Sequence, residues 1–209
     1  MFDYDIIASS SSGNCVRIKD VLVDCGISFK RIVKNVDLNK ISALLITHEH
    51  SDHLKLSTIK SIIETNRRIK IFCNEDVSKI LEINGVTHSI IRLNTEVTIR
   101  QKSGENIIIS PLKLYHDVLT YGYRITFKDF FDQVKVFYAT DTFTLREIVA
   151  KDYDYYFVET NYTEESIDSF DEHRIRNTHL SKEEAQNFFV AMKKDSSVMI
   201  PLHRSSRNY

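Results

Sequence analysis

Four side chains that could bind metal lie within one short segment of the sequence. The heptapeptide T-H-E-H-S-D-H at 47–53 follows the apolar run 43–46, which predicts a buried strand. Imidazole nitrogens and carboxylate oxygens are ligands that Zn²⁺ and similar divalent cations prefer. A single histidine after a strand is usually an ordinary polar residue, but four such groups this close together would each need a partner once buried. We therefore predict metal ligands at His48, His50, Asp52 and His53.

Further candidate ligands follow other predicted strands. His116 comes after the run 111–115, Asp141 after 136–140, and His203 after 198–201. Each stands where an apolar run gives way to polar residues, the place from which side chains carried by a sheet usually form a site. Any one of them could be a turn residue, whereas all of them together indicate one shared site. We expect two divalent metal ions as cofactors, either Zn²⁺ or Mn²⁺.

Length and composition indicate one globular domain over residues 1–209. The chain is 42% hydrophobic and 27% charged, and its five glycines and two prolines argue against long flexible linkers. Residues 1–30 lack the pattern of a signal peptide, and no apolar run approaches the roughly 18 residues that cross a bilayer. We therefore expect a cytoplasmic protein that does not contact membranes.

Cysteine spacing and net charge exclude some other classes of protein. Cys15, Cys25 and Cys73 lack zinc-finger spacing, so we expect buried, reduced thiols. The formal net charge of −1 lacks the basic excess that drives sequence-independent binding to nucleic acid. A polyanionic partner would need a local patch, for which the basic clusters at 30–34, 67–70 and 193–207 are the candidates. The first two of these clusters fit a solvated surface better.

The remaining pattern predicts two blocks of strands with helices between them. Strands are expected at 4–8, 15–18, 21–24, 41–47, 69–73, 89–92, 96–100, 106–114, 121–127, 134–139, 155–159 and 198–201. Helices are expected at 28–35 with Ser28 as N-cap, at 57–66, at 74–82, and at 181–193, where Ser181 and Glu184 form a capping box. This order suits an α/β protein in which two packed sheets are covered by helices, a four-layer α/β/β/α sandwich.

The motifs resemble those of the metallo-β-lactamase superfamily over nearly the whole chain. The H-x-H-x-D-H pattern at 48–53 and A-T-D-T at 139–142 are similar to its metal-binding motifs. More narrowly, the segments 8–15, 22–28, 115–117, 158–161 and 179–181 resemble the WalJ (YycJ) branch, small bacterial and phage proteins described as DNA exonucleases. The ending H-R-S-S-R at 203–207 is similar to the H-x-S-x-R ending of transfer-RNA 3′-processing enzymes of the superfamily.

The resemblance implies roles for individual residues. The implied metal ligands are His48, His50 and His116 for the first ion, Asp52, His53 and His203 for the second, and Asp141 as a bridge. Asp52 would also orient or deprotonate the attacking water, and His179 would act as general acid or bind phosphate oxygens. The residues that would bind substrate are Arg204, Ser205 and Arg207 near the end of the chain, and Ser11 and Asn14 in a serine-rich loop.

These roles predict a metal-dependent phosphodiesterase in which two metals activate a hydroxide, and in particular a DNA exonuclease. A phosphodiesterase of cyclic nucleotides is the alternative, because a near-neutral chain shows no evident clamp for DNA. The second alternative is a non-catalytic binding module whose fold is stabilised by metal. The partner is thus nucleic acid or a nucleotide, and a homodimer is left open. One departure stands out, since Asn161-Tyr162-Thr163 replaces the Asn-His-Asp of the WalJ type.

Overall fold

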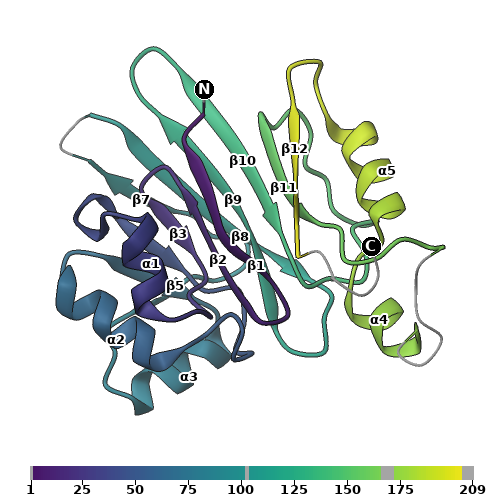
Figure 1. Cartoon of the computed structure of the whole chain (residues 1–209). Coiled ribbons are helices and arrows are strands. Elements are labelled where there is room, and N and C mark those ends of the chain that lie inside the picture. Colours follow the sequence, from purple (N-terminus) through teal and green to yellow (C-terminus); the bar gives the residue numbers. More distant parts are fainter. Residues whose placement is uncertain (1, 102–103, 166–171, 204–209) are drawn as a thin grey trace. The chain divides into compact units, whose positions relative to one another are not determined.

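The chain forms two compact units, residues 1–91 and 92–209. The computed structural model describes residues 2–101, 104–165 and 172–203. Each unit contains one six-stranded sheet with helices (Figure 1). The single domain expected over 1–209 stays a prediction, because two compact units can belong either to one domain or to two.

The sheet of the first unit keeps the order of the sequence. Its strands are β1 (Tyr4–Ser10), β2 (Gly13–Ile18), β3 (Val21–Val23), β4 (Ala43–Leu45), β5 (Lys70–Cys73) and β6 (Ser89–Ile90). The first three strands pair antiparallel, and β3 to β6 are parallel. Parallel neighbours need crossover connections, which are α1 (Phe29–Asn35) with the short 3₁₀ helix η1 (Leu38–Lys40), α2 (Leu56–Thr65) and α3 (Glu75–Ile83).

Both faces of this first sheet are buried. Helices α1, α2 and α3 lie on one side of it (Figure 1), where Ile32, Ile62 and Leu81 join the same apolar core as Leu44 and Ile71. Side chains alternate along a strand, so the other face carries a second apolar set, and Val21, Val23, Ala43 and Leu45 are also fully buried. A sheet buried on both faces is what an inner layer of the predicted sandwich requires.

The sheet of the second unit brings four strand ends to one edge. Its strands, in spatial order, are β12 (Val198–Leu202), β11 (Tyr155–Glu159), β10 (Gln133–Ala139), β9 (Thr120–Lys128), β8 (Asn106–Leu114) and β7 (Val97–Arg100). Strands β10, β11 and β12 are parallel. Because β9 is antiparallel to both β8 and β10, β8 points the same way as these three. The carboxyl ends of β8, β10, β11 and β12 therefore share an edge.

Among its described residues, the second unit has the helices α4 (Glu172–Thr178) and α5 (Lys182–Met192), and α5 lies beside β11 and β12 (Figure 1). The expected cap of α5 is half confirmed, since the backbone N–H of Glu184 donates to Ser181 Oγ at 3.1 Å. The Glu184 carboxylate does not complete the box. It accepts a hydrogen bond from Thr144 Oγ1 instead, at 2.8 Å.

Several sequence-based expectations differ in detail from the structure. Ser28 precedes α1, but its side chain makes no capping hydrogen bond. The strand expected at 41–47 is only Ala43–Leu45, because the chain leaves the sheet early to form the histidine loop. Helix α4 has no counterpart in the prediction. The three cysteines are buried and unpaired, as expected, and no described helix is long and apolar enough to cross a membrane.

Candidate metal centre

Asp24 anchors the histidine loop of the first unit. It follows β3 and is fully buried, and its carboxylate accepts hydrogen bonds from the backbone N–H of Thr47 at 2.8 Å and from Thr47 Oγ1 at 2.9 Å. His53 Nδ1 lies 2.8 Å from the same carboxylate. Burial raises the pKa of Asp24, although His53 and Thr47 act in the opposite direction. The contact places the proton of His53 on Nδ1 and leaves Nε2 with a lone pair for a ligand.

The predicted ligands of the first unit lie together after β4. His48 Nε2 is 3.2 Å from His50 Nδ1, and the ring centroids of His48 and His53 are 4.1 Å apart. His48 and His53 are fully buried, whereas the side chain of Asp52 is 24% exposed, with its Oδ2 3.4 Å from His53 Nε2. Neutral imidazoles packed this closely direct lone pairs at one another unless a proton or a cation lies between them.

Asn14 and Gly26 pack against this loop. The amide nitrogen of Asn14 lies 2.8 Å from His53 Nε2 and 3.3 Å from the carbonyl oxygen of Asp52. Asn14 is 2% exposed, so its contacts are with the ligand loop, and its predicted binding of substrate stays untested. At Gly26, an added Cβ would lie 1.7 Å from the Asp52 carbonyl oxygen, so only glycine fits. Ser11 is exposed in the β1–β2 turn.

The second unit places its candidate ligands at the shared strand edge. His116 follows β8, Asp141 follows β10, Glu159 ends β11 and His203 follows β12. His179 comes from the connection between α4 and α5. One donor atom from each of Asp141, Glu159, His179 and His203 lies within 4.8 Å of the others. This set of imidazole and carboxylate donors fits a borderline divalent cation.

Glu159 is the hub of this cluster. The residue is fully buried, and its Oε1 lies 2.6 Å from His179 Nδ1 and 3.2 Å from His203 Nδ1. The backbone N–H of Thr142 donates to Oε2 at 3.0 Å, which ties the hub to the Asp141 loop. Asp141 Oδ1 lies 3.6 Å from His203 Nε2, so the second ring nitrogen of His203 faces a second carboxylate.

The charge state of the cluster follows from these contacts. Burial alone would lower the pKa of His179 and raise that of Glu159, but the attraction between the two groups outweighs burial. The pKa of His179 is therefore raised and that of Glu159 lowered, which favours an imidazolium–carboxylate pair. At His116, by contrast, burial lowers the pKa. Its Nδ1 donates to the Thr178 carbonyl at 2.9 Å, and its Nε2 lies 3.0 Å from Asp117 Oδ1, so Nε2 is the ring nitrogen that a cation could take.

Three of the site residues have a strained backbone. Asp24, Asp141 and His203 adopt positive φ values of 61°, 52° and 49°. Residues other than glycine rarely adopt this left-handed conformation, which costs on the order of 1–3 kcal/mol and is often found at functional sites. All three follow strands, so the turn redirects the chain and aims each side chain at its cluster.

The structure adds two residues to the predicted site and leaves three undescribed. Asp24 and Glu159 were in segments that carried the family resemblance but were not predicted as site residues. Each is an acid at the end of an apolar strand, the same signal that identified Asp141. The predicted substrate-binding residues Arg204, Ser205 and Arg207 lie outside the described residues.

Comparison with known proteins finds a family model, relatives and similar folds. The family model of the β-lactamase superfamily domain matches residues 19–203. Exodeoxyribonuclease WalJ of Streptococcus pneumoniae is 45% identical over 62 residues, which are 25% of this chain and 23% of that protein. Ribonuclease Z of Clostridium novyi is 28% identical over 130 residues, 52% of this chain and 42% of that protein. The crystal structure of the short form of human tRNase Z superposes with a TM-score of 0.69 at 13% identity, covering 98% of this chain and 93% of that one.

The family model matches most of the chain, and the structure has two mixed sheets with candidate ligands at strand ends. The chain therefore belongs to the family of β-lactamase superfamily domains and has the metallo-β-lactamase fold. This confirms the predicted family and fold class. The relatives in this comparison include nucleases that are matched over less than half of their length. Their activities are therefore a starting point for a proposal about this chain.

Proposed function

We propose that this protein hydrolyses phosphodiester bonds in nucleic acid, and that it is an exonuclease acting on DNA. The contact between Glu159 and His179 carries the proposal, because it raises the pKa of His179 and holds the imidazole beside Asp141 and His203. A proton donor next to a cluster of metal-type ligands suits the departure of an alkoxide from phosphorus. The nuclease names of WalJ and ribonuclease Z support the same reaction class.

The proposed cofactors are two divalent cations, Zn²⁺ or Mn²⁺. The proposed ligands are those that the motif resemblance implies, namely His48, His50, Asp52, His53, His116, Asp141 and His203. When bound, such cations neutralise charge on the phosphate and lower the pKa of water. His53 and His116 each engage Nδ1 with an oxygen, of Asp24 and of the Thr178 carbonyl respectively, and an imidazole held in this way usually binds a metal through Nε2.

The remaining proposed steps belong to side chains of the protein. The partly exposed Asp52 carboxylate orients the attacking water and accepts its proton. His179 donates a proton to the leaving oxygen from Nε2, because its Nδ1 is held by Glu159. The 13% exposure of the His179 side chain gives a substrate access to this nitrogen.

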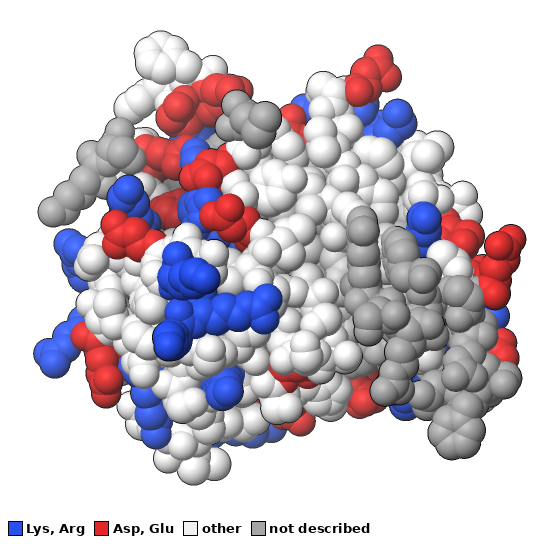
Figure 2. Space-filling model, in the orientation of Figure 1, with Lys and Arg blue, Asp and Glu red and all other residues white. Residues whose placement is uncertain are grey.

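Surface charge favours a second candidate, a phosphodiesterase of small cyclic nucleotides. The net charge is −1, and where charged side chains appear on the face that Figure 2 shows, acidic and basic groups lie near one another. The Lys and Arg atoms of that face gather most densely around α1 (Figure 2), the helix that carries Lys30, Arg31 and Lys34. A long polyanion needs such a patch near its path, whereas a cyclic nucleotide does not.

Direct assays separate the two candidates. Protein loaded with Mn²⁺ or Zn²⁺ is offered end-labelled duplex DNA, single-stranded DNA, RNA and cyclic nucleotides. We expect DNA to shorten progressively from an end, and we expect Asp52→Ala and His179→Ala each to slow cleavage roughly 10²- to 10⁴-fold. Asp76→Ala, which removes an exposed carboxylate of α3, should change nothing. Cleavage of cyclic nucleotides alone would replace the exonuclease with the second candidate, and unchanged activity in Asp52→Ala would refute the assigned role.

The setting in which the protein acts is also a proposal. We propose that it works in the cytoplasm, in agreement with the reduced cysteines. A homodimer stays a prediction that light scattering on the purified protein would test.

A further inference from the structure

A cavity in the second unit has an aromatic wall beside the candidate ligands. The cavity has a volume of about 520 Å³, and its lining includes Tyr115, Phe143 and Tyr162. This volume lies within the roughly 300–1,000 Å³ of typical small-molecule sites. Tyr115 directly precedes His116, and Phe143 follows Asp141 by two residues. Tyr115 and Phe143, which we call the aromatic wall, are therefore carried by the same loops as two predicted metal ligands.

Backbone hydrogen bonds hold these two loops together. The N–H of Phe143 donates to the carbonyl of Tyr115 at 2.9 Å, and the N–H of Tyr115 donates to Thr142 Oγ1 at 3.0 Å. The rings of Tyr115 and Phe143 meet at a centroid distance of 5.8 Å and an angle of 58°. Tyr115 is also fixed by a hydrogen bond from its hydroxyl to Glu147 at 2.6 Å. Phe143 nonetheless stays 41% exposed, so a preorganised aromatic surface faces solvent next to the candidate centre.

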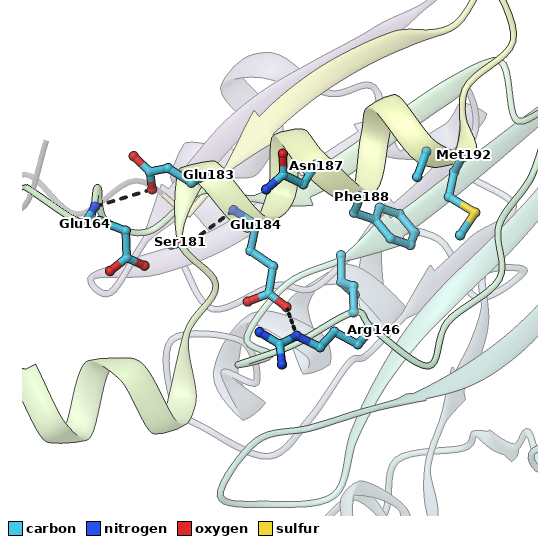
Figure 3. A pocket seen from close by; sticks show the side chains of 10 residues that line it. Arg146, Glu164, Ser181, Glu183, Glu184, Asn187, Phe188 and Met192 are labelled. Carbon is cyan, nitrogen blue, oxygen red and sulfur yellow. Dashed lines mark hydrogen bonds and ion pairs between the residues drawn. The ribbon is translucent and has the colours of Figure 1, made fainter.

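The charges of the cavity disfavour a phosphate as its occupant. Two arginines line it, and each already contacts an acid, Arg146 with Glu184 at 3.6 Å and Arg176 with Glu164 at 2.5 Å. Figure 3 shows the guanidinium of Arg146 turned toward Glu184, in the neighbouring hollow along α5. With Glu147, three carboxylates oppose two guanidiniums. Aromatic rings beside a slight excess of negative charge suit a flat, uncharged group with N–H donors.

We propose that Tyr115 and Phe143 form a stacking site for the nucleobase next to the bond that is cut. Carboxylates of the cavity, among them Glu147 beside the Tyr115 hydroxyl, accept hydrogen bonds from the exocyclic amino group of adenine, cytosine or guanine. This inference rests on the proposed function and deepens it. According to this inference, the protein recognises a base adjacent to the scissile phosphate and not the phosphodiester alone.

A double-change cycle, with one change in the protein and one in the DNA, tests the site through catalysis. DNA ends with a normal terminal nucleotide pair are compared with ends in which the last or last-but-one nucleotide is abasic, using wild type and Phe143→Ala. Stacking of one base on an aromatic side chain corresponds to a factor of roughly 10 to 100. We expect either change alone to lower kcat/KM by such a factor, and the two losses together to fall well short of their product. Losses that multiply fully, or a Phe143→Ala variant that cleaves intact ends as wild type does, would overturn the site.

Matched variants control for the loss of a ring. Phe131→Ala truncates a phenylalanine that is 98% exposed in the β9–β10 turn, and it should leave cleavage unchanged. Phe143→Tyr keeps an aromatic face and should restore most of the activity lost in Phe143→Ala. A Phe143→Tyr variant as slow as Phe143→Ala would show that stacking is not the cause.

A binding measurement makes the inference independent of turnover. Metal-free protein is titrated against a dinucleotide that contains 2-aminopurine, whose fluorescence is quenched by stacking. We expect quenching by wild type and a roughly 10-fold weaker affinity for Phe143→Ala. Quenching that depends on Phe143 in a protein that cleaves no phosphodiester would refute the proposed function but keep the base site. Cleavage without any dependence on the base, and without quenching, would refute the base site but keep the function.

Discussion

At the scale of single residues, buried carbonyl and carboxylate oxygens decide which nitrogen each histidine offers. Asp24 holds Nδ1 of His53, the Thr178 carbonyl holds Nδ1 of His116, and Glu159 holds Nδ1 of His179. In each ring this leaves Nε2 to face the site. Such outer partners orient metal ligands and general acids, and they matter almost as much as the groups that they hold.

Glu159→Gln tests this arrangement. A glutamine keeps the size of the side chain, but its amide nitrogen would set a donor against His179 Nδ1–H or against the Thr142 N–H. We expect metal affinity measured by titration calorimetry, or the rate of phosphodiester cleavage, to fall about 10- to 100-fold. Glu82→Gln, on the exposed side of α3, is the control. Wild-type values for both quantities in Glu159→Gln would mean that the hub is dispensable.

At the scale of elements, the site depends on where strands end and on what holds the following loops. In the first unit the loop after β4 is fixed by backbone contacts as well as by Asp24. The N–H of Asn14 donates to the Asp52 carbonyl at 2.7 Å, and the N–H of Cys25 donates to the His53 carbonyl at 2.9 Å. These short contacts bring two backbone segments so close at Gly26 that no side chain fits between them.

Gly26→Ala should therefore be severe. Its Cβ would lie 2.0 Å from the Asp52 carbonyl carbon, so the loop must move, and we expect the free energy of unfolding to fall by at least about 3 kcal/mol. Gly85→Ala provides the comparison, because nothing lies within 4 Å of its added Cβ although its φ is 69°. We expect about 1 kcal/mol there from backbone strain alone. Equal losses in urea denaturation of the two variants would contradict the close packing at Gly26.

At the scale of the whole molecule, bound cations should act as ligands of the folded state. A cation at 100 times its dissociation constant adds about 2.7 kcal/mol to the free energy of unfolding. For a chain of about this size that raises Tm by roughly 5 to 10 °C. We expect such a rise in calorimetry with Zn²⁺ or Mn²⁺ and its reversal by a chelator. Mg²⁺ prefers oxygen ligands and should have little effect. A Tm that no transition metal changes would count against the candidate centre.

The sequence by itself determined the local features of this protein. The apolar run before T-H-E-H-S-D-H, the strand ends at Asp141 and His203, and the buried cysteines follow from patterns within a few residues. The resemblance to the superfamily could be read from the same short motifs. Ser28 shows the limit of such patterns, since it stands at the predicted N-cap but makes no capping bond.

Only the tertiary structure decided which groups become partners. Glu159 meets His203, 44 residues away, because β11 and β12 are adjacent and parallel, so their carboxyl ends share one edge. It also meets His179, 20 residues away, which comes from the connection between α4 and α5. Strand order of this kind is set by how apolar faces pack over the whole sheet. No window of local sequence contains that information. For this reason candidate ligand types could be predicted from the chain, while the pairing of each histidine with the carboxylate that orients it could not.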